Sequence, residues 1–212
     1  MKDLIIKDYL KIGFSLGIDS YFKIFFYNIL YYIFCYLISL TFVGILIIPA
    51  LTVSFYKFLL SEARNEDISF FELIKQGFKN GLYWKSWLYF LIICLIYLPA
   101  IIPLIFAAYI IVVYETIIFG FIFLILSLIL YLYIKTKFYL GFIFLLDNDK
   151  NLNPIGSLIE SSIVVDKLGF KRIFFINLIS YLAYFFGFIV FLFPFFFMTH
   201  VGVYINAINK ND

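Results

Sequence analysis

Glu115 is the only charged residue between Lys85 and Lys135. A helix needs about 20 apolar residues to cross a hydrocarbon core of about 30 Å, so this stretch is long enough for two crossings. Inside a bilayer the backbone must satisfy its own hydrogen bonds, which favours helices. The whole chain is 65% hydrophobic and 14% charged, against roughly 25% charged in soluble domains. We therefore predict an all-α, polytopic transmembrane helical bundle that forms a single integral membrane domain over residues 1–212.

Glycine and proline divide the apolar sequence into about six predicted spans in three hairpins. Gly44 and Pro49 should break the first apolar run, because proline cannot continue the preceding helix cleanly. Pro99 and Pro103 either kink the third span or turn it at the far surface, and Pro194 separates the last two spans. The second and sixth spans are short and either cross fully or do not. The second is a tight hairpin with the first span, part of one bent helix, or a half-span. The predicted spans are residues 21–48, 50–63, 84–106, 117–135, 173–192 and 195–209.

A charged segment, residues 61–85, joins the first two hairpins, and we predict that it is an amphipathic elbow on the membrane surface. Ser69 and Glu72 have the spacing of a capping box, so a helix should begin there. Gly81 is the expected end of that helix. Residues 1–20 alternate charged and apolar positions and are predicted to form a short interfacial helix.

The second predicted elbow, residues 147–170, follows a fourth span whose helix should continue to Leu146. Asp147 begins a polar loop that we interpret as a solvated turn, because it lacks the glycine and late glutamate of a calcium-binding loop. Asn153 followed by Pro154 indicates the N-cap and first residue of a helix that ends near Gly169. Its expected apolar face consists of Ile155, Leu158, Ile159, Ser162 and Ile163.

Charge is distributed asymmetrically over this topology. With the elbows and both termini on one side, all 16 Lys and Arg residues lie on that side or at its edge, provided that Lys57 snorkels towards it. Of the 13 acidic residues, only Glu115 lies in the opposite tips. The charged side is therefore cytoplasmic, and so are both termini. The predicted opposite tips are near residues 44–50, 107–116 and 193–195. The abundance of Phe, Tyr, Ile, Lys and Asn indicates an AT-rich genome, so we expect the cell (inner) membrane of a bacterium.

The sequence offers little reactive chemistry. His200 is the only histidine, and Cys35 and Cys94 both lie in apolar runs. A histidine-rich metal site is excluded, and the chain has neither a phosphate-binding glycine loop nor a cysteine cluster. His200 is either a packed histidine or a proton-transfer group. We predict no catalytic residue, no metal and no cofactor, and no nucleic-acid partner because the basic residues form no patch.

Four polar residues are candidates for a polar path through the bundle: Asn28, Glu115, Asn177 and Asn206. In one interpretation the asparagines form structural hydrogen bonds between helices, worth about 0.6–2 kcal/mol each, and Glu115 is a solvated loop residue. In the other they line a substrate path, with Glu115 as a cation- or proton-binding carboxylate at its mouth.

The segments before the two elbows show a weak internal similarity. Phe55-Tyr56 precedes the first elbow and Phe138-Tyr139 precedes the second, and each hairpin tip contains proline. The similarity is either a true repeat of a hairpin and an elbow or a chance effect of abundant Phe and Tyr.

Residues of the first half follow one pattern, with an Asn in the first span, a Pro-Ala turn and a Phe-rich basic segment. They are Asn28, Gly44, Pro49, Ala50, Phe70 and Phe78-Lys79-Asn80. In these residues the chain resembles small bacterial integral membrane proteins of the YesL type.

The second half is similar to another group of polytopic bacterial membrane proteins, which carry an A-x-x-x-S…G-x-x-x-R-x-F-type segment before the last two helices. The matching residues are Ser157, Glu160, Ser161, Gly169 and Arg172-Ile173-Phe174, with Ser157 in place of the alanine and a looser spacing. Both resemblances imply a multi-helix fold in a bacterial inner membrane, and neither carries a catalytic residue to transfer.

Two functions fit these observations. In the first, the chain is a non-enzymatic membrane accessory or regulatory component that contacts the lipid bilayer and binds protein partners through its elbows. The alternative is a small-molecule transporter or transporter subunit, which predicts a polar cavity joining the four candidate residues. A lipid-processing enzyme would require Glu115 beside His200, and we do not expect the chain to be an enzyme.

Overall fold

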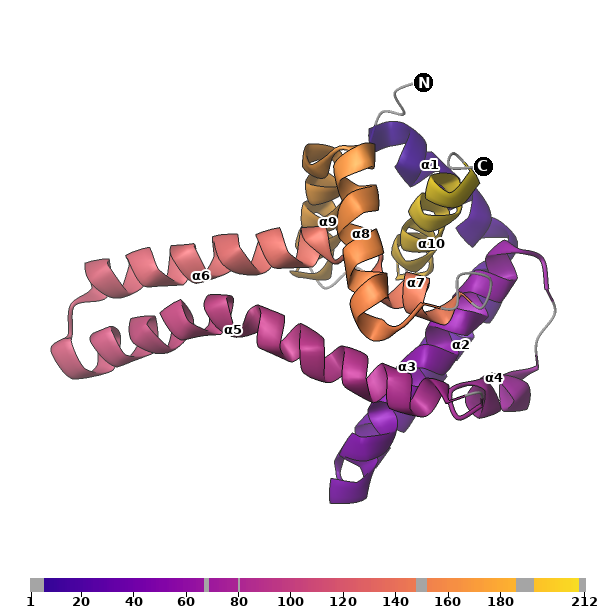
Figure 1. The fold of residues 1–212 in the computed structure, drawn as a ribbon, viewed down its shortest axis with the longest axis horizontal. Helices are drawn as coiled ribbons and strands as arrows, with labels where there is room; N and C mark the ends of the chain where they lie inside the picture. The colour runs from indigo at the N-terminus through magenta and orange to yellow at the C-terminus, as the bar shows by residue number, and fades with distance from the viewer. Residues whose placement is uncertain (1–5, 67–68, 80, 148–151, 186–192, 210–212) are drawn as a thin grey trace.

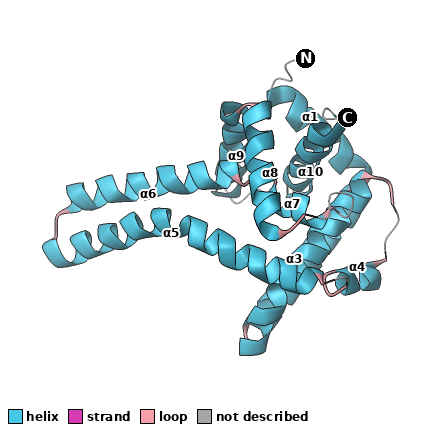
Figure 2. Ribbon diagram, viewed as in Figure 1, coloured by secondary structure: helices cyan, strands magenta, loops and turns pink. Residues whose placement is uncertain are grey.

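The computed structural model describes residues 6–66, 69–79, 81–147, 152–185 and 193–209. All regular elements in this part of the chain are helices (Figure 2), which confirms the all-α prediction for these residues. In chain order the helices are α1 (Ile6–Asp19), α2 (Tyr21–Ser39), α3 (Phe42–Ala63), α4 (Phe70–Gln76), α5 (Leu82–Tyr114), α6 (Ile117–Lys137), α7 (Gly141–Leu146), α8 (Pro154–Leu168), α9 (Phe170–Phe185) and α10 (Phe193–Asn209).

Among the described residues, four helical stretches are long and apolar enough to cross a membrane: Tyr21–Ser39, Leu46–Ala63, Leu82–Tyr114 and Ile117–Leu146. They pair as two hairpins, α2 with α3 and α5 with α6. The hairpins extend in different directions from a body that contains α1, α8, α9 and α10 (Figure 1). This arrangement fits the predicted class of membrane protein.

The first hairpin turns at residues 40–41, before the predicted break at residues 44–50. Two side-chain hydroxyl groups lie at the end of α2. The Oγ of Ser39 and the Oγ1 of Thr41 donate to carbonyls three residues earlier, at 2.7 and 2.9 Å, and so satisfy the end of the helix. The predicted boundary is therefore corrected, because the chain turns before it reaches Gly44 and Pro49.

Pro49 lies inside α3 and does not end it. The indole Nε1 of Trp87, from α5, donates to the carbonyl of Leu46 at 2.8 Å, three residues before the proline. Proline removes a helical donor, and neighbouring helices can satisfy the carbonyls that it disturbs. The hydrogen bond from Trp87 of α5 thus stabilises the turn of α3 that Pro49 interrupts.

The second hairpin is longer than predicted. Pro99 and Pro103 both lie inside α5, which bends part-way along its length (Figure 1). The carbonyl of Ala100, three residues before the second proline, accepts a hydrogen bond from Ser127 Oγ of α6 at 2.6 Å. The chain turns only at Glu115, whose φ is 53°. The prolines therefore kink the helix, and the predicted end at residue 106 is too early.

α10 is the central helix of the body. Its fully buried side chains are Met198, Val201, Val203 and Tyr204, each at most 1% exposed. α1 packs along α10 with a very close approach at two glycines. A Cβ at Gly13 would lie 2.5 Å from the Cα of Thr199, and one at Gly202 would lie 2.8 Å from the Cγ2 of Ile12. Small residues of this kind let two helix backbones meet.

The beginning of α10 lies beside the junction of α1 and α2. The ring of Phe195 stacks on Phe14 with centroids 4.1 Å apart, and its centroid is 5.3 Å from that of Tyr21. The predicted six-span topology places residues 193–195 and residues 1–22 on opposite sides of the membrane. The ring contacts of Phe195 with Phe14 and Tyr21 do not match a separation by the thickness of a membrane. Helices α9 and α10 instead pack in the body beside the two long hairpins.

The first elbow helix begins as predicted and ends earlier. Ser69 is the N-cap of α4, and its Oγ accepts the N–H of Glu72 at 3.4 Å. The helix ends just before Gly77, whose N–H donates to Ser54 Oγ of α3 at 3.0 Å. A Cβ at this glycine would lie 2.1 Å from a backbone oxygen of α3. The expected end at Gly81 is therefore corrected, because close docking on α3 fixes the end at Gly77.

The second elbow helix, α8, both begins and ends where the sequence indicates. The side chain of Asn153 caps it by accepting the N–H of Gly156 at 2.6 Å, Pro154 is its first residue, and Gly169 follows it with a φ of 96°. The apolar face differs in part, because Leu158 is buried against Tyr89 of α5 and Leu145 of α7. The exposed stripe consists of Ile155, Ile159 and Ile163.

Three ion pairs join the elbows to the helices around them. Lys23 of α2 pairs with Glu62 of α3, and Lys137 of α6 pairs with Asp166 of α8 at 2.5 Å. Arg64 Nη2 lies 3.1 Å from Asp147 Oδ2. Asp147 is only 2% exposed, so the predicted solvated turn is wrong at its first residue. The carboxylate is buried because it has two partners, Arg64 and the hydroxyl of Tyr204.

Candidate functional site: a tyrosine-lined cavity

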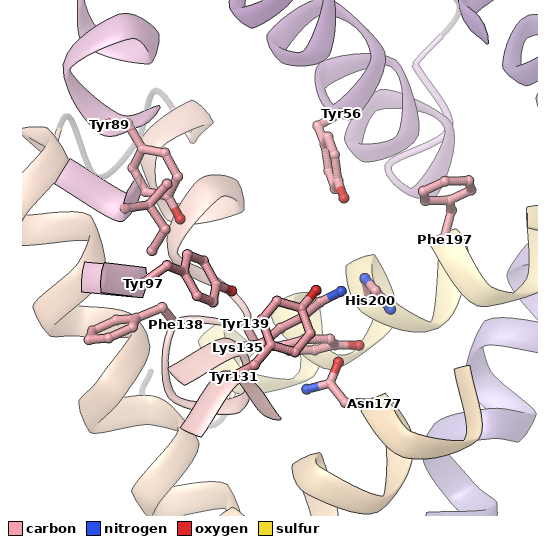
Figure 3. Close-up of a pocket in the computed structure, with 11 residues that line it drawn as sticks. Tyr56, Tyr89, Tyr97, Tyr131, Lys135, Phe138, Tyr139, Asn177, Phe197 and His200 are labelled. Atoms are coloured by element: carbon pink, nitrogen blue, oxygen red, sulfur yellow. The ribbon is translucent and has the colours of Figure 1, made fainter. Parts of the chain in front are cut away.

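A cavity of about 470 Å³ lies where the α5–α6 hairpin meets the body (Figure 3). Helices α3, α5, α6, α9 and α10 and the turn between α6 and α7 all contribute to its wall. Five of the lining side chains are tyrosines. The lining residues are Tyr56, Tyr89, Ile93, Tyr97, Tyr131, Lys135, Phe138, Tyr139, Asn177, Phe197 and His200.

The turn between α6 and α7 is held in place by a serine of the second elbow helix. Ser161 Oγ accepts the N–H of Leu140 at 3.1 Å and is 3.2 Å from the carbonyl of Lys137, to which it donates. Both backbone groups lie at the interruption between the helices, where the helical pattern leaves them without partners. The serine therefore fixes the turn that carries Phe138 and Tyr139 into the wall of the cavity.

Ring contacts order the aromatic wall. The ring of Tyr139 lies against that of His200, with centroids 4.5 Å apart, and those of Tyr97 and Tyr131 are 5.4 Å apart. Tyr56 meets Phe197 edge to face at 6.4 Å. Tilted and edge-to-face pairs at these distances are favourable arrangements of aromatic rings. The wall is thus a packed set of rings contributed by several helices.

Three buried polar atoms of lining residues have no hydrogen-bond partner within the protein. They are the hydroxyl of Tyr139, the Nδ2 of Asn177 and the Nε2 of His200. Buried polar groups in proteins nearly always have a partner, so three exceptions around one cavity require an explanation. One water molecule occupies about 30 Å³ of liquid, far less than the cavity, whereas ligand sites measure about 300–1,000 Å³. The cavity therefore has the size of a ligand site, and three of its lining residues carry buried polar atoms without a partner.

Lys135 gives the cavity a positive charge. None of the described lining residues is Asp or Glu, so the wall combines one ammonium group with phenol, amide and imidazole groups. An ionisable residue within an apolar span is costly and is commonly part of a functional site. Ammonium and phenol donors both bind anionic oxygens by charge-assisted hydrogen bonds. The arrangement suits an organic anion whose apolar part contacts the tyrosine rings.

Of the four residues of the predicted polar path, only Asn177 lines this cavity. Asn28 is buried in α2, and its Oδ1 also has no hydrogen-bond partner. Asn206 is partly exposed on α10, and Glu115 is exposed at the far tip of the α5–α6 hairpin (Figure 1). His200 lines the cavity, so Glu115 does not lie beside it. The four residues are thus dispersed over the fold.

A sequence feature that suggests internal repetition coincides with the cavity. The two Phe-Tyr dipeptides that precede the elbows contribute Tyr56 and Tyr139, and both tyrosines line the same space. Lys135, a basic residue in the fourth span, is a second feature that coincides with it. The other tyrosines could not be singled out, because the chain has 18 tyrosines and 30 phenylalanines.

Among the described residues, no group of three or more His, Cys, Asp and Glu side chains is placed to hold a metal ion. Comparison of the chain with family models, curated proteins and solved structures finds no match. The resemblance to proteins of the YesL type therefore stays a prediction.

Proposed function

We propose that this chain is a non-enzymatic, multi-pass membrane protein that binds an organic anion in the tyrosine-lined cavity, as a small-molecule transporter or transporter subunit. The observation that supports this most directly is the set of three unpartnered buried atoms, on Tyr139, Asn177 and His200, around one cavity. Lys135 determines the charge of the ligand. A protein with this function needs only to recognise its ligand by charge and hydrogen bonds.

For the topology we propose four crossings, by α2, α3, α5 and α6, with the body and both elbows at the cytoplasmic face of a bacterial inner membrane. The support is the distribution of charge, because the ion pairs of the elbows lie near the body and Glu115 is the only charged residue at the two hairpin turns. An even number of crossings keeps both termini cytoplasmic, as in the six-span prediction.

Binding of phenyl phosphate and benzoate to the purified protein in nanodiscs tests the site. Each probe combines an anionic group with one aromatic ring. We expect at least one of them to raise the midpoint of thermal unfolding, since a ligand at 100 times its Kd stabilises by about 2.7 kcal/mol. Lys135→Met and Tyr139→Phe should abolish or weaken this shift, and Glu115→Gln, at the far tip, should preserve it.

Two results would contradict the proposal: neither probe stabilises the protein, or Lys135→Met binds as well as the natural chain. Uptake of the bound probe into proteoliposomes then separates a transporter from a subunit that binds without transport.

A second candidate function, as a membrane accessory component that binds a protein partner, is supported by α8. Ile155, Ile159 and Ile163 are 57%, 55% and 43% exposed and follow one another at a spacing of four residues. Such a spacing forms one apolar stripe along a helix. Crosslinking from this stripe in native membranes tests the idea, and capture of lipid alone would remove its basis.

A further inference from the structure

A groove of about 540 Å³ between α5 and α6 shares part of its wall with the tyrosine-lined cavity. Tyr97 and Tyr131 line both spaces, with ring centroids 5.4 Å apart. The remaining residues of the groove are Cys94, Ala100, Ile101, Leu104, Leu124, Ser127 and Leu128. The two spaces therefore meet at this pair of tyrosines.

The wall changes from aliphatic to cationic across the tyrosine pair. On α6 the residues Leu124, Leu128, Tyr131 and Lys135 are spaced by four, three and four positions, so they lie on one face of the helix. Ser127 adds little polarity to the groove, because its hydroxyl already donates to the carbonyl of Ala100 at 2.6 Å. One continuous surface thus joins an apolar groove to a positively charged cavity.

The dimensions and direction of this surface match one leaflet of a bilayer. Leu124 and Lys135 are 11 residues apart, which corresponds to about 16 Å along a helix. The hydrocarbon core is about 30 Å thick, so the distance is about half of a membrane. The charged end lies at the body, where Lys137 pairs with Asp166, and the apolar end points towards the tip of the hairpin. A lipid in that leaflet has the same orientation, with its head group at the surface.

We infer that the ligand is an amphiphile with one acyl chain and an anionic head group. The head group occupies the tyrosine-lined cavity near Lys135, and the chain lies in the groove between α5 and α6. Carboxylate and phosphate head groups share the required chemistry, which is a negative charge with several acceptor oxygens. This inference rests on the proposed function, because it identifies the class of ligand bound at the same site.

Dodecanoate and dodecyl phosphate, each carrying a photoreactive diazirine at the end of the chain, test the inference. The protein in nanodiscs is irradiated with each probe, and the modified peptides are identified by mass spectrometry. We expect crosslinks to concentrate on residues 94–104 and 124–131. Preference for one probe then assigns the head group as a carboxylate or a phosphate.

Three variants separate the two ends of the ligand. Lys135→Met should lower labelling about tenfold or more, because it removes the charge-assisted hydrogen bond to the head group. Leu124→Trp fills the groove and should lower labelling, while the probe that stabilises the natural protein, phenyl phosphate or benzoate, still binds. This binding also shows that the variant is folded. Leu126→Trp is the matched control, since Leu126 is 43% exposed on the same helix and does not line the groove.

Labelling spread evenly over the exposed faces of α5 and α6 would identify annular lipid only and would overturn the inference. Equal labelling of the Leu124→Trp and Leu126→Trp variants would overturn it as well. If phenyl phosphate and benzoate both fail to stabilise the natural protein, the proposed function fails together with this inference. If one of them binds and the acyl probes scatter, only the acyl-chain inference fails.

Discussion

Arg64 and Asp147 form an ion pair between the two elbows, 83 residues apart in the chain, with Nη2 and Oδ2 separated by 3.1 Å. Arg64 follows α3, and Asp147 follows α7. The hydroxyl of Tyr204, from the centre of α10, donates to the same carboxylate oxygen at 2.5 Å. The carboxylate thus joins a hairpin, an elbow and the core of the body. Because Asp147 is buried and Arg64 is partly exposed, the stability of this junction depends mainly on Asp147.

Asp147→Ala is expected to lower the free energy of unfolding by about 3 kcal/mol, because it removes the carboxylate that accepts the buried hydroxyl of Tyr204 and pairs with Arg64. Tyr204→Phe removes one hydrogen bond and should cost about 1–2 kcal/mol. Asp166→Ala is the control, since Asp166 is 57% exposed and its pair with Lys137 should contribute less than about 1 kcal/mol. Unfolding in mixed micelles measures all three, and a larger loss for Asp166→Ala than for Asp147→Ala would contradict the assignment.

Gly13→Ala should destabilise the body by about 1–3 kcal/mol through overpacking. Its Cβ would lie 2.0 Å from Thr199 Oγ1 and 2.5 Å from the Cα of the same residue, so rotation of a side chain cannot relieve the clash. Limited proteolysis within residues 6–19 should become faster as α1 separates from α10. Ser15→Ala, on an exposed position of α1, should change neither measurement. Equal proteolysis of the two variants would show that α1 does not depend on this contact.

Local signals predicted the parts of the fold that local hydrogen bonds determine. The caps at Ser69 and Asn153 lie within three residues of the N–H groups that they bind, so the sequence contains the whole interaction. The burial of Asp147 cannot be predicted from the local sequence, because its partners, Arg64 and Tyr204, are 83 and 57 residues away. The breaks predicted at Pro49 and after residue 106 are misplaced for a related reason. Proline predicts a break only where no other helix supplies donors to the disturbed carbonyls, and here Trp87 does so for α3.

Even less of the candidate site than of the fold can be predicted from the sequence. Asn177 was singled out as a polar residue in a span, but the residues around it are tyrosines that a composition with 24% aromatics conceals. The four residues of the predicted polar path lie apart in the fold, because the position of a residue within a span does not indicate which way its side chain points. Only tertiary packing brings Tyr56 of α3 beside residues of α9 and α10.

Cysteine labelling tests the topology at two turns. Glu115→Cys and Asn65→Cys are each introduced in a Cys35→Ser, Cys94→Ser background, because those are the only native cysteines. A membrane-impermeant maleimide applied to intact cells should label residue 115 and should reach residue 65 only after permeabilisation. Both positions are exposed, so accessibility in the folded protein does not limit the reaction. Labelling of both from the same side would refute the arrangement of α5 between opposite faces.

Ser161→Ala should disturb the cavity without changing any residue that lines it. The substitution leaves the N–H of Leu140 and the carbonyl of Lys137 without their side-chain partner, at an expected cost of about 1–3 kcal/mol. Because these groups fix the turn that carries Tyr139, the affinity for phenyl phosphate or benzoate should fall together with stability. Ser162→Ala, at the next and partly exposed position, is the matched control and should preserve both. If Ser161→Ala loses stability but keeps full affinity, the turn does not position Tyr139 for binding, and the hydroxyl serves the fold alone.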